Sequence, residues 1–270
     1  MSADLCFSLN KFPEGDEKIS GKSFELRTGG PAANAALTVK LLGGKSELIA
    51  LTDTSALGNT LIDQLAENNF DTSLIIRESG GLTTAAVLAE HSGSRQVISC
   101  KSTLRPCTLP TSVDEFNPSV ILFDGHLPQL SQKLIGKFPK AITILDAGSL
   151  HEGTELLADK VCWLIASAKY ARAKSGEQDL NKAIEKLSSL NSRVIITDGA
   201  NGSYWQTFDS SGHTPAPKIK AIDSNGAGDV FHGAFAYGLS QELSFEENIV
   251  QATEAAALSC SQPGIKHISQ

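Results

Sequence analysis

The segment 223–231, which reads D-S-N-G-A-G-D-V-F, combines small residues with a carboxylate at the expected start of a helix. Gly226, Ala227 and Gly228 carry little or no side chain, so a ligand can approach their backbone closely. The first N–H groups of a helix lack intrahelical partners, which suits a phosphate or the charge that develops during its transfer. Asp229 stands in that first turn, where a carboxylate can accept a proton from an attacking hydroxyl group. Taken alone, such a short motif is more often a glycine-rich turn whose acidic residue only caps a helix.

Two further glycine-rich segments have the composition of ligand-binding turns. The segment 29–34, G-G-P-A-A-N, leads into a small-residue helix, and Asn34 offers both a donor and an acceptor to a sugar hydroxyl. The segment 197–202, T-D-G-A-N-G, follows an apolar run, and open α/β sheets bind ligands at the carboxyl ends of their strands. Each segment by itself is also typical of an ordinary turn. The sequence contains neither G-x-x-x-x-G-K-[ST] nor G-x-G-x-x-G, which argues against P-loop and dinucleotide-binding proteins.

The elements that must position these residues alternate between short apolar runs and segments with helical periodicity. Strands are predicted at 46–51, 119–123, 141–145, 161–166 and 194–197. Helices are predicted at 32–42, 60–68, 180–190, 226–239 and 245–260. This alternation, with nearly continuous apolar strands, is typical of a parallel sheet covered by helices on both faces.

Two segments depart from that alternation and resemble antiparallel hairpins. They fall at about 5–28 and 82–100, and each contains turn residues between two stretches of strand character. Two hairpins distant in sequence can pair into a small separate sheet. We therefore predict one α/β domain over 1–270, with these strands as a β-sheet lid and the α/β body formed by the remainder.

Composition excludes several classes of protein. The 270 residues include 23 Lys and Arg and 30 Asp and Glu, which gives a formal net charge of −7. This acidic balance argues against a nucleic-acid partner. No apolar run approaches the ~18 residues that span a bilayer, so no membrane association is expected. The start of the chain lacks the pattern of a secretion signal. The five cysteines show no C-x-x-C spacing and are expected to be free thiols in the cytoplasm.

The three glycine-rich segments, in this order, resemble the signatures of the ribokinase-like (PfkB) carbohydrate kinases. The C-terminal signature of that family is close to D-T-x-G-A-G-D-x-F, which matches 223–231. The N-terminal signature, a Gly-Gly with an Asn four residues after its second Gly, matches Gly30 and Asn34. Asp4, nine residues before a proline, and the T-x-G-x-x-G turn at 197–202 match as well.

The resemblance implies a ribokinase-like three-layer α/β/α fold with a mainly parallel sheet and a small β-sheet lid. It implies transfer of the γ-phosphoryl group of ATP to a hydroxymethyl group of a small sugar-like substrate, with Asp229 as base and the backbone of Gly226, Ala227 and Gly228 as anion hole. The residues implied to hold substrate hydroxyls are Asp4, Gly30 and Asn34. Those implied to line the nucleotide site are Thr197, Gly199, Gly202, Thr253, Ala256 and Pro263. Mg²⁺ is expected to arrive as Mg-ATP without a named protein ligand, and a monovalent cation such as K⁺ is worth testing near Asp223.

Departures from the family pattern leave alternatives open. The family's N-x-x-E motif should follow the strand at 161–166, but 167–170 reads S-A-K-Y, so its Glu is absent. The segments before Asp4 and after Gly264 are also shorter than in the family. One alternative is therefore a catalytically weak member that acts as a nucleotide- or sugar-binding module. Another is a nucleoside kinase of the same superfamily, although aromatic residues make up only 6% of the chain and a sugar is favoured.

Two expectations concern neighbouring residues and assembly. His232 is expected to be a packing or surface histidine, and Asp146 either to lie near the nucleotide or to cap a turn. Because exposed sheet edges and faces invite association, a homodimer through the β-lid is predicted.

Overall fold

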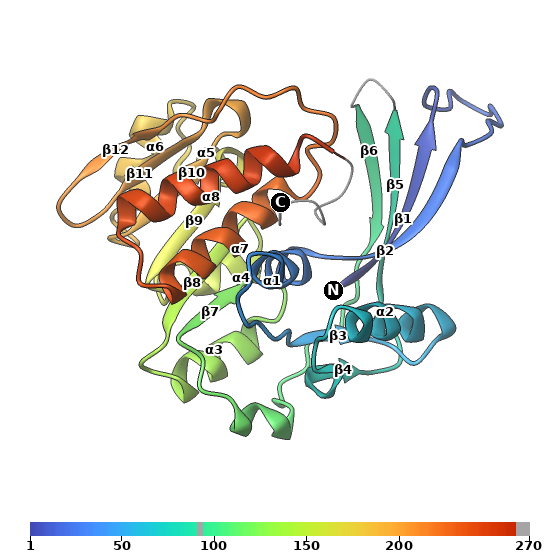
Figure 1. Cartoon of the computed structure of the whole chain (residues 1–270), viewed down its shortest axis with the longest axis horizontal. Helices are drawn as coiled ribbons and strands as arrows, with labels where there is room; N and C mark the ends of the chain where they lie inside the picture. The colour runs from blue at the N-terminus through green and yellow to red at the C-terminus, as the bar shows by residue number, and fades with distance from the viewer. Residues whose placement is uncertain (91–93, 263–270) are drawn as a thin grey trace. The chain divides into compact units, whose positions relative to one another are not determined.

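The computed structural model describes residues 1–90 and 94–262 (Figure 1). The chain divides into two compact units. The first comprises Met1–Ala33 and Ser46–Arg105, and the second comprises Asn34–Lys45 and the described residues from Pro106 onward.

A four-stranded sheet with the order β2-β1-β5-β6 forms the centre of the first unit. Its strands are β1 (Ser2–Leu9), β2 (Ser23–Gly29), β5 (Thr83–Glu90) and β6 (Arg95–Cys100). β1 pairs antiparallel with β2 and parallel with β5, and β5 pairs antiparallel with β6. Strands from the two segments predicted as hairpins thus lie side by side in one sheet. Their role as a lid, and the assignment of 1–270 to a single domain, remain predictions.

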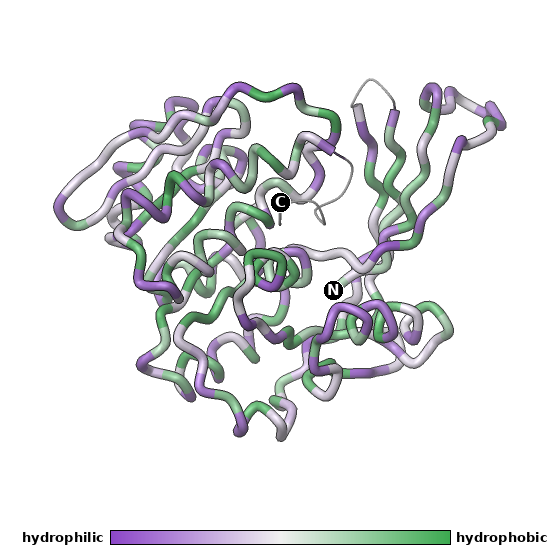
Figure 2. Tube along the Cα trace, viewed as in Figure 1, coloured by the Kyte–Doolittle hydropathy of each residue, from purple (hydrophilic) through white to green (hydrophobic). Residues whose placement is uncertain are grey.

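One amphipathic helix packs against this sheet. Helix α2 (Ala56–Glu67) contacts β1 and β2, and it begins where the side chain of Ser55 accepts a hydrogen bond from the N–H of Gly58. Leu61 and Leu65, four residues apart on one face, are buried, and hydrophilic and hydrophobic residues alternate along the helix in Figure 2. A short parallel pair, β3 (Ala50–Thr52) and β4 (Ile75–Arg77), lies next to the turn η1 (Thr72–Leu74).

The second unit is built on a six-stranded sheet with the order β12-β11-β10-β9-β8-β7. β7 to β10 are parallel, whereas β11 and β12 are antiparallel additions at one edge. The strands are β7 (Val120–Phe123), β8 (Ile142–Ala147), β9 (Trp163–Ser167), β10 (Val194–Thr197), β11 (Ser203–Gln206) and β12 (Ser211–Thr214). Ile144, Leu164 and Ile195 are completely buried, as expected for parallel strands covered on both faces. The four predicted strands from 119 to 197 match β7 to β10 closely, but the strand predicted at 46–51 is only the short β3 at 50–52.

Helices cover both faces of this sheet (Figure 1). The helices and turns on one face and in its connections are α3 (Pro128–Lys137), α4 (Glu152–Leu157), α5 (Ala168–Ser175), α6 (Leu180–Leu187), η2 (Thr111–Glu115) and η3 (Gly199–Asn201). The other face is covered by α7 (Ala227–Ser240) and α8 (Phe245–Ser259). This arrangement is the predicted three-layer α/β/α body with a mainly parallel sheet.

Helix α7 is the core helix of the second unit. Its Phe231 and Phe235 are buried among apolar residues of the sheet, which include Ile144, Trp163 and Ile195. Helix α1 (Pro31–Leu41), whose residues from 34 belong to the second unit, packs tightly on α7 at Gly233. A Cβ atom at Gly233 would lie 2.5 Å from the carbonyl oxygen of Ala35, so only glycine permits this approach. Across residues 1–90 and 94–262, no helix is long and apolar enough to cross a membrane.

Candidate active site

Polar residues gather where the parallel strands of the second unit end. Asp124 directly follows β7, Asp146 is the penultimate residue of β8, and Ser167 is the last residue of β9. Parallel strands bring their carboxyl ends to the same edge of the sheet, which is where open α/β sheets bind ligands. The side chain of Asp146 is only 5% exposed, so its carboxylate is largely removed from water.

Asp229 and Asn34, which the sequence analysis singled out in separate segments, are in direct contact. Asp229 lies in the first turn of α7 and Asn34 in the first turn and a half of α1. The Nδ2 of Asn34 donates a hydrogen bond of 2.6 Å to Oδ2 of Asp229. This bond fixes the orientation of the carboxylate and leaves its other oxygen, Oδ1, for a further partner.

The surroundings of Asp229 shift its proton affinity strongly. Burial raises the pKa of Asp229, and the nearby carboxylate of Asp146 raises it further. The amide of Asn34 and the charge of His232 lower the pKa, and the balance brings it to about 7. Its surface is nevertheless partly accessible, so a ligand can reach the carboxylate. A carboxylate with a pKa near neutrality is well matched to accepting a proton at that pH.

The start of α7 presents backbone donors beside this carboxylate. Gly226 precedes the helix in the left-handed conformation, with φ of +78°, which glycine adopts without strain. The N–H of Val230 donates to the carbonyl of Gly226 at 2.8 Å. Within the part of the chain that the structure describes, the N–H groups of Gly228 and Asp229 have no hydrogen-bond partner. A helix N-terminus with open donors favours an anion such as a phosphate.

His232 belongs to this cluster, although the sequence analysis expected a packing or surface histidine. Its Nδ1 lies 2.6 Å from the carbonyl oxygen of Gly228, and its Nε2 lies 3.3 Å from that of Ile165. Nε2 is also 3.5 Å from Oδ1 of Asp146, and both side chains are about 5% exposed or less. The sequence did contain a signal that His232 lies near Asp229, because residues three apart share one face of a helix. A carboxylate partner from β8 was not visible in that spacing.

The turn predicted to line the nucleotide site follows β10. Thr197 ends that strand, and its hydroxyl donates to the carbonyl of Ala166 at 3.4 Å. Gly199 and Gly202 have φ of +55° and +89°. A Cβ atom at Gly202 would lie 2.1 Å from the carbonyl oxygen of Thr214, so the backbone itself requires glycine there. The turn lies at the same edge of the sheet as Asp124 and the other strand-end residues.

The remaining predicted nucleotide residues lie on or after α8. Thr253 is buried, and its hydroxyl donates to the carbonyl of Ile249 at 2.7 Å, so this hydroxyl already has an acceptor. Ala256 is half-buried one turn further along the helix. Pro263 lies outside the described residues.

Two of the predicted substrate residues belong to the first unit. Asp4 lies within β1, where its Oδ1 accepts a hydrogen bond of 2.6 Å from the hydroxyl of Ser2. Burial raises the pKa of Asp4. A Cβ atom at Gly29 would lie 2.0 Å from Oδ2 of Asp4, so the position of this carboxylate requires glycine at residue 29. Gly30 has φ of +105°, a conformation that favours glycine.

The residue at the family's missing Glu position is Tyr170, and it is fully buried. Its hydroxyl has no hydrogen-bond partner within 1–90 and 94–262, and burial raises its pKa to about 12. The side chain therefore does not replace the carboxylate. No group of three or more His, Cys, Asp and Glu in the described part of the chain is arranged to hold a metal ion.

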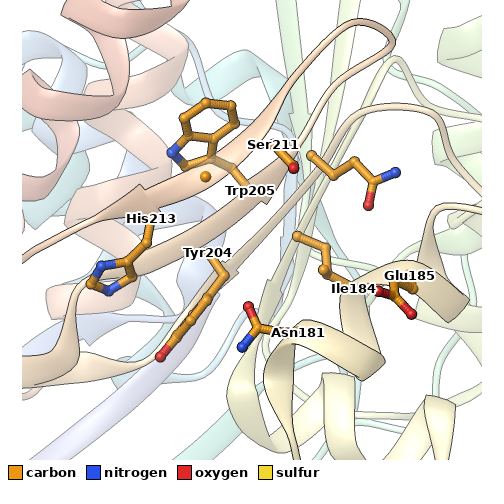
Figure 3. Close-up of a pocket in the computed structure, with 9 residues that line it drawn as sticks. Asn181, Ile184, Glu185, Tyr204, Trp205, Ser211 and His213 are labelled. Carbon is orange, nitrogen blue, oxygen red and sulfur yellow. The ribbon is translucent and has the colours of Figure 1, made fainter.

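A separate groove of about 280 Å³ lies between α6 and the β11–β12 hairpin (Figure 3). The rings of Tyr204 and His213 lie 4.7 Å apart there, and Asn181, Ile184 and Glu185 face them from α6. None of the predicted site residues lines this groove. It is therefore distinct from the cluster around Asp229.

A parallel α/β/α body, with a carboxylate and open backbone donors at a helix start, defines a protein able to bind an anion next to a proton acceptor. The model of the pfkB family carbohydrate kinases matches residues 2–269. The chain therefore belongs to the PfkB family, as the sequence motifs indicated. This membership confirms the prediction of a phosphotransferase with an alcohol group as acceptor.

Individual relatives agree with this assignment. The chain is 25% identical over 271 residues to the ribokinase of Lactococcus lactis, covering 98% of this chain and 89% of the relative. The solved ribokinase of Thermotoga maritima has a TM-score of 0.86 and 24% identity, covering 99% of this chain and 92% of that one. An Arabidopsis thaliana ribokinase, solved with ribose and ATP, has a TM-score of 0.84 and 20% identity, with coverage of 99% and 92%. These structures confirm the ribokinase-like fold.

Proposed function

We propose that this protein transfers the γ-phosphoryl group of ATP to a hydroxymethyl group of a sugar or sugar derivative. The observation that carries the proposal is the carboxylate of Asp229, held by Asn34 at 2.6 Å beside the open N-terminus of α7. The ribokinase and deoxyribokinase relatives support a sugar as the acceptor.

In this proposal Asp229 takes the proton of the acceptor hydroxyl as its oxygen attacks the γ-phosphorus. The bond from that phosphorus to the bridging oxygen of ADP breaks, and ADP leaves with the electron pair. Negative charge on the transferred group is stabilised by the backbone donors of the segment Gly226, Ala227 and Gly228 at the start of α7. Phosphoryl transfer depends mainly on the positioning of the reactants and on the stabilisation of charge. Asp229 and the backbone donors at the start of α7 would supply most of both.

The other predicted roles follow from this arrangement. Asn34, already bonded to Asp229 through its amide nitrogen, can accept from a substrate hydroxyl through its amide oxygen. Asp4 and Gly30 are proposed to hold further hydroxyls. The proposed nucleotide residues are Thr197, Gly199, Gly202, Thr253, Ala256 and Pro263.

The open donors at the start of α7 fit the phosphates of ATP. Mg²⁺ is proposed to arrive as Mg-ATP, held by phosphate oxygens and water, because Tyr170 stands where the family's N-x-x-E motif has its Glu. For the monovalent cation, the family resemblance makes the region of Asp223, in the loop before α7, the place to test K⁺.

A homodimer through the sheet of the first unit is also proposed. Phe24 on β2 and Ile98 on β6, which the strand register places on the same face of the sheet, are 57% and 65% exposed. A second copy of this sheet would cover them.

The decisive experiment is ADP release with Mg-ATP over a panel of pentoses, ketoses, sugar acids and nucleosides. Asp229→Asn is the control, because its amide oxygen can still accept the bond from Asn34. Turnover of one sugar that is lost in the variant supports the proposal. Turnover of a nucleoside alone would favour the second candidate function, that of a nucleoside kinase. The solved nucleoside kinase of Burkholderia thailandensis has the same fold as this chain, with a TM-score of 0.79. Binding of ATP without turnover would identify a nucleotide-binding module.

A further inference from the structure

The ring of His232 is surrounded by hydrogen-bond acceptors. Nδ1 faces the carbonyl oxygen of Gly228 at 2.6 Å, and Nε2 faces the carbonyl oxygen of Ile165 at 3.3 Å. A backbone carbonyl can only accept, so each ring nitrogen is favoured to carry a hydrogen. With both nitrogens protonated the ring is a cation, and the carboxylate of Asp146, with Oδ1 3.5 Å from Nε2, balances its charge.

These contacts join three elements at the carboxyl edge of the sheet. Gly228 belongs to the first turn of α7, Ile165 to β9 and Asp146 to β8. The side chain of His232 is only 4% exposed, so its position is fixed by packing as well as by its bonds. The carbonyl that accepts from Nδ1 is that of Gly228, and its peptide unit also contains the open N–H of Asp229. The orientation of that donor is therefore coupled to His232.

We propose that His232, held as a buried cation by Asp146, is a positioning residue for phosphoryl transfer. It anchors the peptide unit between Gly228 and Asp229 at the start of α7 and provides the positive charge that keeps Asp229 available as a proton acceptor. This inference rests on the proposed function of Asp229 and deepens it.

The charged groups around Asp229 come from several elements. Asp146 on β8 and Asp124 after β7 both raise the pKa of Asp229, whereas His232 on its own helix lowers it. The amide of Asn34 on α1 acts in the same direction as His232. Burial raises the pKa of Asp146, while the charges of His232 and His126 act to lower it and the carboxylate of Asp124 acts to raise it. Loss of His232 should therefore raise the pKa of Asp229, whereas loss of Asp146 removes a carboxylate and also the partner of the cation, so its two effects on Asp229 oppose each other.

The experiment compares His232→Asn and Asp146→Asn with the wild type. The amide of an Asn at 232 can still donate to the carbonyl of Gly228, but it carries no charge and is too short to reach β8 and β9. We expect the acid limb of kcat/KM to move to higher pH in His232→Asn and to move much less in Asp146→Asn, which removes a carboxylate and also the partner that holds His232 as a cation. We also expect kcat of His232→Asn to fall about tenfold or more while KM for the sugar changes little, because the donor is misplaced in the transition state. Asp209→Asn, at an exposed position, is the matched control and should leave the profile unchanged.

Two measurements do not depend on turnover. In ¹⁵N NMR of the wild type, both ring nitrogens of His232 should carry hydrogens, since each faces a carbonyl oxygen. In ¹³C NMR, the titration of the Asp229 carboxyl should shift to higher pH in His232→Asn and much less in Asp146→Asn. A neutral ring with one unprotonated nitrogen would overturn the proposal, even where a variant fails to fold. Equal shifts of Asp229 in the two variants, or no shift in His232→Asn, would overturn it as well. If the NMR results hold but no acceptor is phosphorylated, it is the proposed function that fails.

Discussion

Replacement of Asp229 by Asn should make the protein more stable, and the gain should grow with pH. The pKa of this carboxyl rises from its ordinary 3.8 to about 7 on folding, because burial and then the carboxylate of Asp146 disfavour the charged form. The folded state therefore binds the proton more tightly than the unfolded chain does. Stability is lost as pH rises from about 4 to about 7, and the loss levels off above that range.

The size of the effect follows from the two pKa values. At ~1.4 kcal/mol for each pH unit between them, complete desolvation would cost up to about 4 kcal/mol above neutrality. The side chain of Asp229 is partly accessible to solvent, so about 2 kcal/mol is a realistic expectation after screening. For a chain of 270 residues, with ~2.1 cal/mol/K per residue, this corresponds to a rise in Tm of about 4 °C. An Asn at 229 has no charge to bury and keeps an acceptor for Asn34.

Thermal unfolding of the wild type and the Asp229→Asn variant at about pH 5 and about pH 8 measures this difference. We expect a clear advantage of the variant at the higher pH and a smaller one at the lower pH. Asp209→Asn serves as the exposed control and should show no such dependence. A wild type that is more stable than the variant at about pH 8, or a difference between the two proteins that is the same at both pH values, would contradict this expectation.

Three further predictions address the neighbouring features. Asn34→Leu removes a donor that lowers the pKa of Asp229, so the acid limb of kcat/KM should move to higher pH; an unmoved limb would contradict the role of this bond. Gly233→Ala places a Cβ 2.5 Å from a carbonyl oxygen of α1 and should lower the free energy of unfolding by about 1–3 kcal/mol. The control is Gly136→Ala, where the added Cβ meets nothing within 4 Å, and this change should be neutral or stabilising by up to ~1 kcal/mol. Urea unfolding measures both variants, and equal stabilities would argue against tight packing of α1 on α7. Ile98→Lys on the exposed face of β6 should convert a dimer into monomers by light scattering, and a wild type already monomeric at micromolar concentration would exclude the proposed interface.

Local sequence patterns predicted the main strands, the start of the key helix and the family of this protein. The apolar runs that become β7 to β10 are long enough and apolar enough to predict buried parallel strands, and the helix starting near 226 was visible from its glycines and its periodicity. The motifs at 29–34, 197–202 and 223–231 indicated the family and placed Asp229 at a helix start. These features depend on residues adjacent in the chain, so a linear pattern contains them.

The contacts, burial and distances between charges in the candidate site could be seen only in the tertiary structure. Asn34 and Asp229 are 195 positions apart, and nothing in either motif shows that one donates to the other at 2.6 Å. His232 has the same local spacing as an ordinary packing residue, and it becomes a buried partner of Asp146 only because α7 packs against β8 and β9. Burial and the distances between charges arise when distant segments pack together. For that reason the proton affinity of Asp229 is a property of the folded protein rather than of its motif.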